Sequence, residues 1–156
     1  MRKIPRSALL LGLAGVLPFA LAAFLAEFPA PEIGGEAYIL VHPKDAPAIL
    51  SAYGTVILCF MSGVLWGFAA KGPTERATRG YALSVVPALY AFFLTTRHLF
   101  GVKSDVAAIQ FLIAGFIGVL ALDYLFWKQG DAPPWWMALR GLLTGLVVFC
   151  LWIGLP

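Results

Sequence analysis

The sequence has few charged side chains, and this scarcity excludes most classes of soluble protein. Only 12% of its 156 residues are charged, whereas 61% are hydrophobic. A soluble domain carries about 25% charged residues, so this chain has too little polar surface to cover a globule in water. The net charge of +3 does not indicate nucleic-acid binding, because the basic residues lie at the ends of apolar runs. The composition therefore predicts an integral membrane protein in contact with the lipid bilayer.

Side chains that support chemistry are also scarce. The only cysteines, Cys59 and Cys150, lie inside apolar runs and form no CxxC pair, so we expect buried small hydrophobic residues and not a disulfide or zinc site. His42 and His98 are not spaced as metal ligands on one helix face. The sequence contains no Ser/His/Asp set, carboxylate cluster or glycine-rich phosphate loop. We expect a non-enzymatic protein without a metal or cofactor.

Long apolar runs dominate what remains. A bilayer-spanning helix needs about 20 mostly apolar residues, and five segments meet that length. They predict a single all-α bundle over residues 1–156, with spans near 7–28, 48–70, 80–96, 105–127 and 135–154. The first run follows basic residues, as a signal peptide does, but its roughly 22 residues exceed a typical signal core. Pro87 predicts a kink in the third span, where a neighbouring helix must cover the freed carbonyl.

The distribution of Lys and Arg predicts the orientation. Seven basic residues fall on the side of the N-terminus: Arg2, Lys3, Arg6, Lys71, Arg76, Arg79 and Lys128. Three fall on the opposite side: Lys44, Arg97 and Lys103. The positive-inside rule then predicts a cytoplasmic N-terminus and a periplasmic C-terminus, in the cytoplasmic (inner) membrane of a bacterium.

Aromatic residues agree with this orientation. Amphipathic rings prefer the membrane interface. The expected interfacial anchors are Trp66, Trp127, Trp135 and Trp136 on the cytoplasmic side and Trp152 on the outer side. The one long connection, residues 29–46, is acidic and rich in proline and glycine, so it is either a solvated loop or a docking surface for a partner or cation.

Asp123 and Arg140 are opposite charges inside otherwise apolar runs. They lie almost symmetrically about a predicted turn at residues 129–134, so an antiparallel hairpin brings them to the same depth. Pairing offsets the cost of a charge in the membrane, and the planar guanidinium can hold a carboxylate with two bonds. We expect a structural ion pair. Snorkelling of both side chains to the headgroups, or a proton relay or anion site, are the alternatives.

Two segments match the GxxxG motif of packed membrane helices. The glycine pairs are Gly63 with Gly67 and Gly141 with Gly145. Small residues four apart let two helix backbones approach closely. We expect these glycines to pack helices together within the bundle, with contact to another subunit as the alternative.

Several of these stretches together resemble a known family. They are residues 53–67 and 79–87, Pro18-Phe19, and Asp123 followed by Pro134-Trp135 and Leu139-Arg140. They are similar to the transmembrane protein 69-like family of small five-helix membrane proteins of unknown function. The resemblance implies the five-span architecture and an energy-transducing inner membrane. It also implies a histidine before the Trp-Gly of the second span, where this chain has Leu65.

The small size, odd helix count and lack of a catalytic set favour one function. We expect an accessory or assembly subunit of a larger membrane complex, such as a respiratory or photosynthetic one, with other membrane-protein subunits as partners. A small oligomeric channel or transporter that uses Asp123 and Arg140 is the alternative. A membrane enzyme that handles lipid or quinone, with Trp135 and Trp136 beside Arg140, is the third hypothesis.

Overall fold

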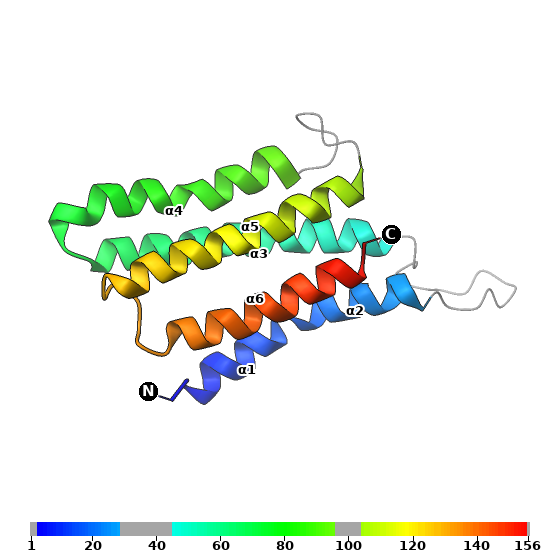
Figure 1. Cartoon of the computed structure of the whole chain (residues 1–156), viewed down its shortest axis with the longest axis horizontal. Coiled ribbons are helices and arrows are strands. Elements are labelled where there is room, and N and C mark those ends of the chain that lie inside the picture. The colour runs from blue at the N-terminus through cyan, green and yellow to red at the C-terminus, as the bar shows by residue number, and fades with distance from the viewer. Residues whose placement is uncertain (1–2, 29–44, 96–103, 156) are drawn as a thin grey trace, which may run out of the picture.

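The computed structural model describes residues 3–28, 45–95 and 104–155, and every regular element among them is a helix. The helices are α1 (Arg6–Ala14), α2 (Leu17–Glu27), α3 (Ala46–Lys71), α4 (Thr74–Thr95), α5 (Asp105–Lys128) and α6 (Trp136–Ile153) (Figure 1). With α1 and α2 taken together, five segments are long and apolar enough to cross a membrane, as predicted. Residues 29–44 of the predicted connection 29–46 lie outside the described residues, as do His42 and His98, and Ala46 already belongs to α3.

The first span is not the single helix that its sequence predicts, because it divides into α1 and α2 near Gly15. Pro18 stands in the first turn of α2 and has no N–H to offer the carbonyl of Ala14. The hydroxyl of Tyr53, on α3, donates to the carbonyl oxygen of Gly15 at 3.0 Å. A side chain of a neighbouring helix therefore satisfies a backbone group at the break, as the membrane interior requires.

The third span begins earlier than predicted. α4 starts at Thr74, so most of the expected loop 71–79 is helical and only a tight connection joins α3 to α4. The prediction started too late because polar residues, beginning with Thr74 and Glu75, lower the hydropathy of the first turns although they form helix. Pro87 is buried inside α4, and the hydroxyl of Ser62 on α3 donates to the carbonyl oxygen of Ser84, three residues before the proline. The bond comes from a neighbouring helix, as predicted, but it covers Ser84 and not Leu83, whose carbonyl the proline leaves without its N–H partner.

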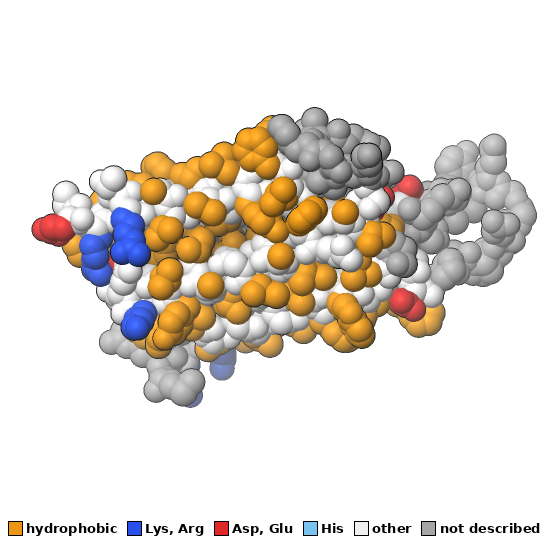
Figure 2. Space-filling view, turned by 45° about the horizontal axis from the view of Figure 1, so that its top comes forward, with side chains coloured by type: hydrophobic (Ala, Val, Ile, Leu, Met, Phe, Trp, Pro, Cys, Tyr) orange, Lys and Arg blue, Asp and Glu red, His pale blue; other side chains and the backbone are white. Residues whose placement is uncertain are grey.

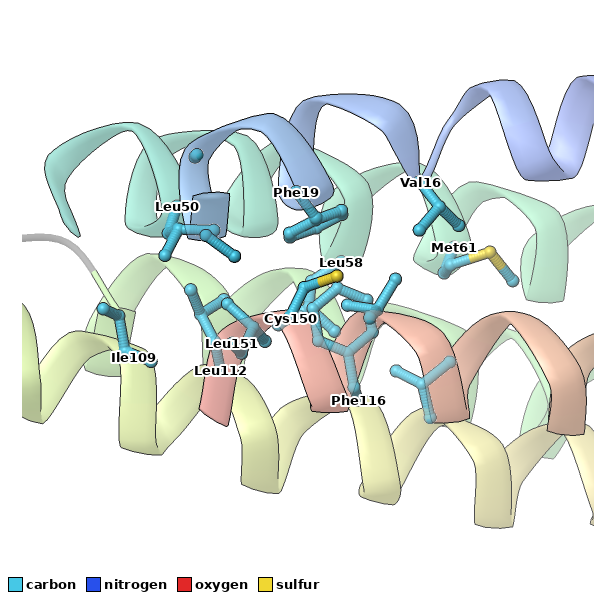
Figure 3. Close-up of a cluster of buried hydrophobic side chains, with 14 of the residues drawn as sticks. Val16, Phe19, Leu50, Leu58, Met61, Ile109, Leu112, Phe116, Cys150 and Leu151 are labelled. Carbon is cyan, nitrogen blue, oxygen red and sulfur yellow. The ribbon is translucent and has the colours of Figure 1, made fainter. Parts of the chain in front are cut away.

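The bundle is built around α3 and α5 (Figure 1). α3 packs against α2, α4 and α5, while α6 packs against α5 and the α1–α2 span. The main core fills the space between these helices, and Figure 3 shows Phe19 of α2, Leu58 of α3, Phe116 of α5 and Leu151 of α6 converging there. Phe19 and Phe116 meet edge to face, with ring centroids 6.0 Å apart.

Three polar or sulfur-containing positions complete the description of the helices. Ser104 caps α5, accepting a hydrogen bond from the backbone N–H of Ala107 at 3.3 Å. The hydroxyls of Thr55 and Thr95 share a 2.7 Å hydrogen bond between α3 and α4. Cys150 is buried as expected, but the expectation was wrong for Cys59, which lies exposed on the outer face of α3.

Basic side chains gather at one end of the bundle. The N-terminus, the α3–α4 connection and the α5–α6 turn lie at that end, and the C-terminus lies at the other (Figure 1). Figure 2 shows Lys and Arg side chains concentrated at the same end, beside the apolar surface that covers the length of the helices. This grouping is the one on which the predicted orientation depends. Lys44, Arg97 and Lys103 lie outside the described residues.

Candidate functional site

The turn between α5 and α6 is a well-formed helix stop. Gly130 adopts a φ of +82°, the left-handed conformation that favours glycine. Its N–H donates to the carbonyl of Trp127, and the N–H of Asp131 donates to the carbonyl of Phe126, both at 3.0 Å. These two bonds form a Schellman motif, which satisfies carbonyls that the end of a helix leaves unpaired. Arg76 at the start of α4 lies 3.6 Å from Asp131 and ties the turn to the rest of the bundle.

Asp123 and Arg140 lie in contact, as their spacing about this turn predicts. The guanidinium Nε of Arg140 donates to Oδ2 of Asp123 at 2.6 Å. The aspartate is completely buried and the arginine is 5% exposed. Both side chains are covered by the protein itself, so each charge depends on the other for its partner.

The second oxygen of Asp123 is taken by a residue that the sequence did not single out for this role. The indole Nε1 of Trp136 donates to Oδ1 at 2.8 Å, so the predicted two-bond arginine fork is replaced by one bond from each donor. Trp136 packs edge to face on Phe68, with ring centroids 5.1 Å apart. Trp136 is half-buried at the start of α6, and its role as an interfacial anchor stays a prediction. The missed signal was spacing, because Trp136 and Arg140 are four apart and share one face of α6.

An apolar pocket of about 140 Å³ lies beside the pair. Arg140 and Thr144 contribute the polar groups of its lining, and both side chains are buried. The opposite wall comes from the break between α1 and α2, where Gly12, Gly15 and Val16 line the space. Because the break interrupts the regular packing of the first span against α6, the proline-containing segment helps to form this pocket.

The apolar walls of the pocket come from the main core. Figure 3 shows Val16, Met61 and Phe116, which all line the pocket, within the same cluster of side chains. Leu11 and Phe60 stand at the surface of the lining, 74% and 64% exposed. The pocket therefore opens sideways, toward the acyl chains of the bilayer.

The four motif glycines do not pack helices within the bundle, so that expectation was wrong. Gly63, Gly67, Gly141 and Gly145 are all exposed, and a Cβ atom added at any of them would meet nothing within 4 Å. Other glycines make the close internal contacts: a Cβ at Gly12, Gly54, Gly80, Gly115 or Gly154 would lie under 3.0 Å from a side-chain atom of a neighbouring helix. The motif pairs thus point outward, on α3 and α6.

The remaining tryptophans lie where interfacial side chains are expected. Trp66 and Trp127 are 49% and 37% exposed near the basic end, and Trp66 packs on the ring of Tyr81 in a tilted contact, with ring centroids 4.5 Å apart. Trp135 immediately precedes α6. Trp152 is 66% exposed near the opposite end of α6. Their function as anchors stays a prediction.

These features define a multi-pass helical membrane protein whose last two spans are joined by a buried ion pair. The chain belongs to a family described as "Protein of unknown function (DUF3429)", which matches residues 4–156. It is 33% identical over 153 residues to Transmembrane protein 69 of Xenopus tropicalis, across 97% of this chain and 54% of that protein. The chain thus spans about half the length of this relative. The resemblance inferred from the sequence is confirmed.

Two further points follow from the comparison. No solved structure matches the chain. The relative comes from a eukaryote, so a bacterial inner membrane stays a prediction. At position 65, where the resemblance implied a histidine, Leu65 is completely buried and packs with Ala69 and Phe126 in a small second core near the basic end.

Proposed function

We propose that this chain is a non-enzymatic accessory or assembly subunit of an inner-membrane complex, and that it binds other membrane proteins through the outward glycine faces of α3 and α6. The observation that carries the proposal is the empty space outside Gly141 and Gly145 on α6 and outside Gly63 and Gly67 on α3. In lipid, close approach of helices at small residues drives association where the hydrophobic effect cannot.

The internal glycines support this interpretation. At Gly54 and Gly115, side chains of neighbouring helices come so close that a Cβ would be under 3.0 Å away. The chain therefore uses glycine where helices must approach closely. A glycine inside a helix costs about 1 kcal/mol relative to alanine, so outward pairs are a disadvantage unless something packs on them.

The channel or transporter alternative has less support. Asp123 is the acidic group that such a pathway needs, but it is completely buried and accepts bonds from both Arg140 and Trp136. A pathway residue must exchange partners with water or an ion during transport.

The proposal is tested by native mass measurement on gently solubilised membranes from the native source. The wild-type chain should migrate with partner subunits. Replacing Gly141 and Gly145 with leucine, or Gly63 and Gly67 with leucine, should release it as a monomer with an unchanged unfolding temperature, because each new side chain meets open space. Gly118→Leu is the matched control, since Gly118 is also outward but has no second glycine four residues away.

Two results would contradict the proposal. One is a wild-type chain that always migrates at monomer mass. The other is a complex that persists in both double-leucine variants.

A further inference from the structure

The pocket beside the ion pair holds two hydrogen-bond donors that no described residue uses. Nη2 of Arg140 and Oγ1 of Thr144 are buried, and neither has a hydrogen-bond partner within the described chain. The two residues are 5% and 4% exposed, stand one turn apart on the same face of α6, and both line the pocket. An unpaired buried donor costs about 1–3 kcal/mol. Two of them at one apolar pocket indicate that an acceptor atom of a ligand completes the site.

The charge balance indicates a neutral acceptor. The positive charge of Arg140 is already matched by Asp123, which lies 2.6 Å away. An anionic ligand would bring an uncompensated negative charge into a low-dielectric interior, at a cost of several kcal/mol. A carbonyl oxygen accepts two hydrogen bonds without adding charge, so it fits both Nη2 and the Thr144 hydroxyl.

The size and position of the pocket further restrict which class of ligand fits. Its volume is about 140 Å³, and a cavity of about 150 Å³ admits one benzene ring. The opening at Leu11 and Phe60 faces the acyl chains, where an isoprenoid or alkyl tail can extend. Arg140 and Thr144 are the fifth and ninth residues of α6, and a rise of 1.5 Å per residue places Thr144 about 12 Å along the helix. That depth lies inside the hydrocarbon region and beyond the ester groups of phospholipids.

We propose that this pocket binds the ring of a lipophilic quinone, with one ring carbonyl accepting hydrogen bonds from Arg140 and Thr144. Asp123 and Trp136 act as positioning residues: Asp123 accepts from Nε of Arg140 and leaves Nη2 free, and Trp136 holds the carboxylate by donating to its other oxygen. The quinone enters sideways from the bilayer, and its tail remains among the lipids. None of the four outward glycines lines this pocket, so the proposal does not rest on the glycine faces, although Phe60 at the opening lies on the same face of α3 as Gly63 and Gly67.

The test uses the full chain in phosphatidylcholine nanodiscs and a radiolabelled benzoquinone with a ten-carbon tail. Binding above that of empty nanodiscs should saturate at one quinone per chain. Thr144→Val keeps the shape of the side chain and removes one hydrogen bond, so the Kd should rise about 2- to 12-fold. Val147→Phe fills the pocket and should abolish binding. Leu142→Phe adds a ring at a 45% exposed position of the same helix and should leave the Kd unchanged.

Competition experiments distinguish a quinone from other lipids that carry an oxygen acceptor. Palmitate should compete poorly, because its carboxylate is charged. Native mass spectrometry of the purified chain should detect no bound phospholipid whose retention depends on Thr144. The proposal is overturned by the absence of saturable binding, by a Kd that neither Thr144→Val nor Val147→Phe changes, by stronger binding of palmitate than of quinone, or by a Thr144-dependent phospholipid.

Discussion

Asp123 accepts hydrogen bonds from two side chains of α6, and the geometry of one turn brings all three groups together. The Schellman motif at Gly130 fixes where α5 ends, and so fixes the depth at which Arg140 meets the carboxylate. A substitution at either charge costs more free energy here than at the surface, because a buried charge that loses its partner has no water to replace it. The pair is therefore expected to set the packing of α5 against α6.

Removing either charge should destabilise the bundle. Asp123→Ala and Arg140→Ala are each expected to lower the free energy of unfolding by about 3–5 kcal/mol, the typical cost of an uncompensated buried charge. The measurement is thermal unfolding in detergent, together with the amount of protein that accumulates in membranes. The exchange of the two residues should recover only part of the loss, because Trp136 would then point its N–H at an arginine.

A longer, half-exposed ion pair provides the control for this experiment. Arg76→Ala removes the 3.6 Å contact with Asp131 by truncating the partner that is 45% exposed, and should change stability by less than about 1 kcal/mol. If both single variants of the buried pair accumulate and unfold like the wild-type chain, the structural interpretation of the pair is wrong.

The sequence predicted the charged members of the site but not the rest. Asp123 and Arg140 stand out because a charge is rare in an apolar span, and symmetry about the turn was enough to pair them. Trp136 and Thr144 carry no such signal. In a membrane protein both the inner and the outer faces of a helix are apolar, so hydropathy does not reveal how the helix is rotated. For the same reason the outward direction of Gly141 and Gly145 was missed.

At the scale of elements, proline positions shape the helices more than hydropathy predicts. Pro18 divides the first span, and Pro87 is accommodated within α4. In both cases a hydroxyl of α3 covers a backbone carbonyl near the proline: Tyr53 at Gly15 and Ser62 at Ser84. The number of spans followed from run length alone. The division of the first span did not, because the apolar run continues through the break.

The hydrogen bond from Tyr53 should stabilise the break in the first span. Tyr53→Phe removes the hydroxyl and keeps the ring, which packs on Phe19 at 4.9 Å. We expect a loss of about 0.5–1.5 kcal/mol in the free energy of unfolding, measured by thermal denaturation in detergent. In a Pro18→Ala background the loss should shrink, because a continuous helix supplies its own N–H donors to these carbonyls.

Tyr124→Phe is the matched control, since Tyr124 is 47% exposed on α5 and its ring lies against Trp127. It should leave the unfolding temperature unchanged. An equal effect of Tyr53→Phe with and without Pro18 would show that the hydroxyl does not act at the break.

At the scale of the whole molecule, the two ends of the bundle differ in charge. The described basic residues of the α3–α4 and α5–α6 connections lie with the N-terminus, and the ends of the other connections carry Glu27, Asp45 and Asp105. Which membrane face each end meets is a property of insertion and not of packing, so the folded shape alone does not encode it. The positive-inside rule supplies that information from the sequence and predicts a cytoplasmic basic end.

Labelling of single cysteines in intact bacteria tests this orientation. In a chain with Cys59→Ser and Cys150→Ser, an impermeant maleimide should label Asp45→Cys, which is exposed at the acidic end, but not Glu75→Cys, which is exposed at the basic end. After cell lysis both should react, which controls for accessibility. Replacement of Lys71, Arg76 and Arg79 with glutamine should weaken the preference and make a fraction of the Glu75→Cys chains react in intact cells. The reverse labelling pattern in the parent chain would contradict a cytoplasmic N-terminus.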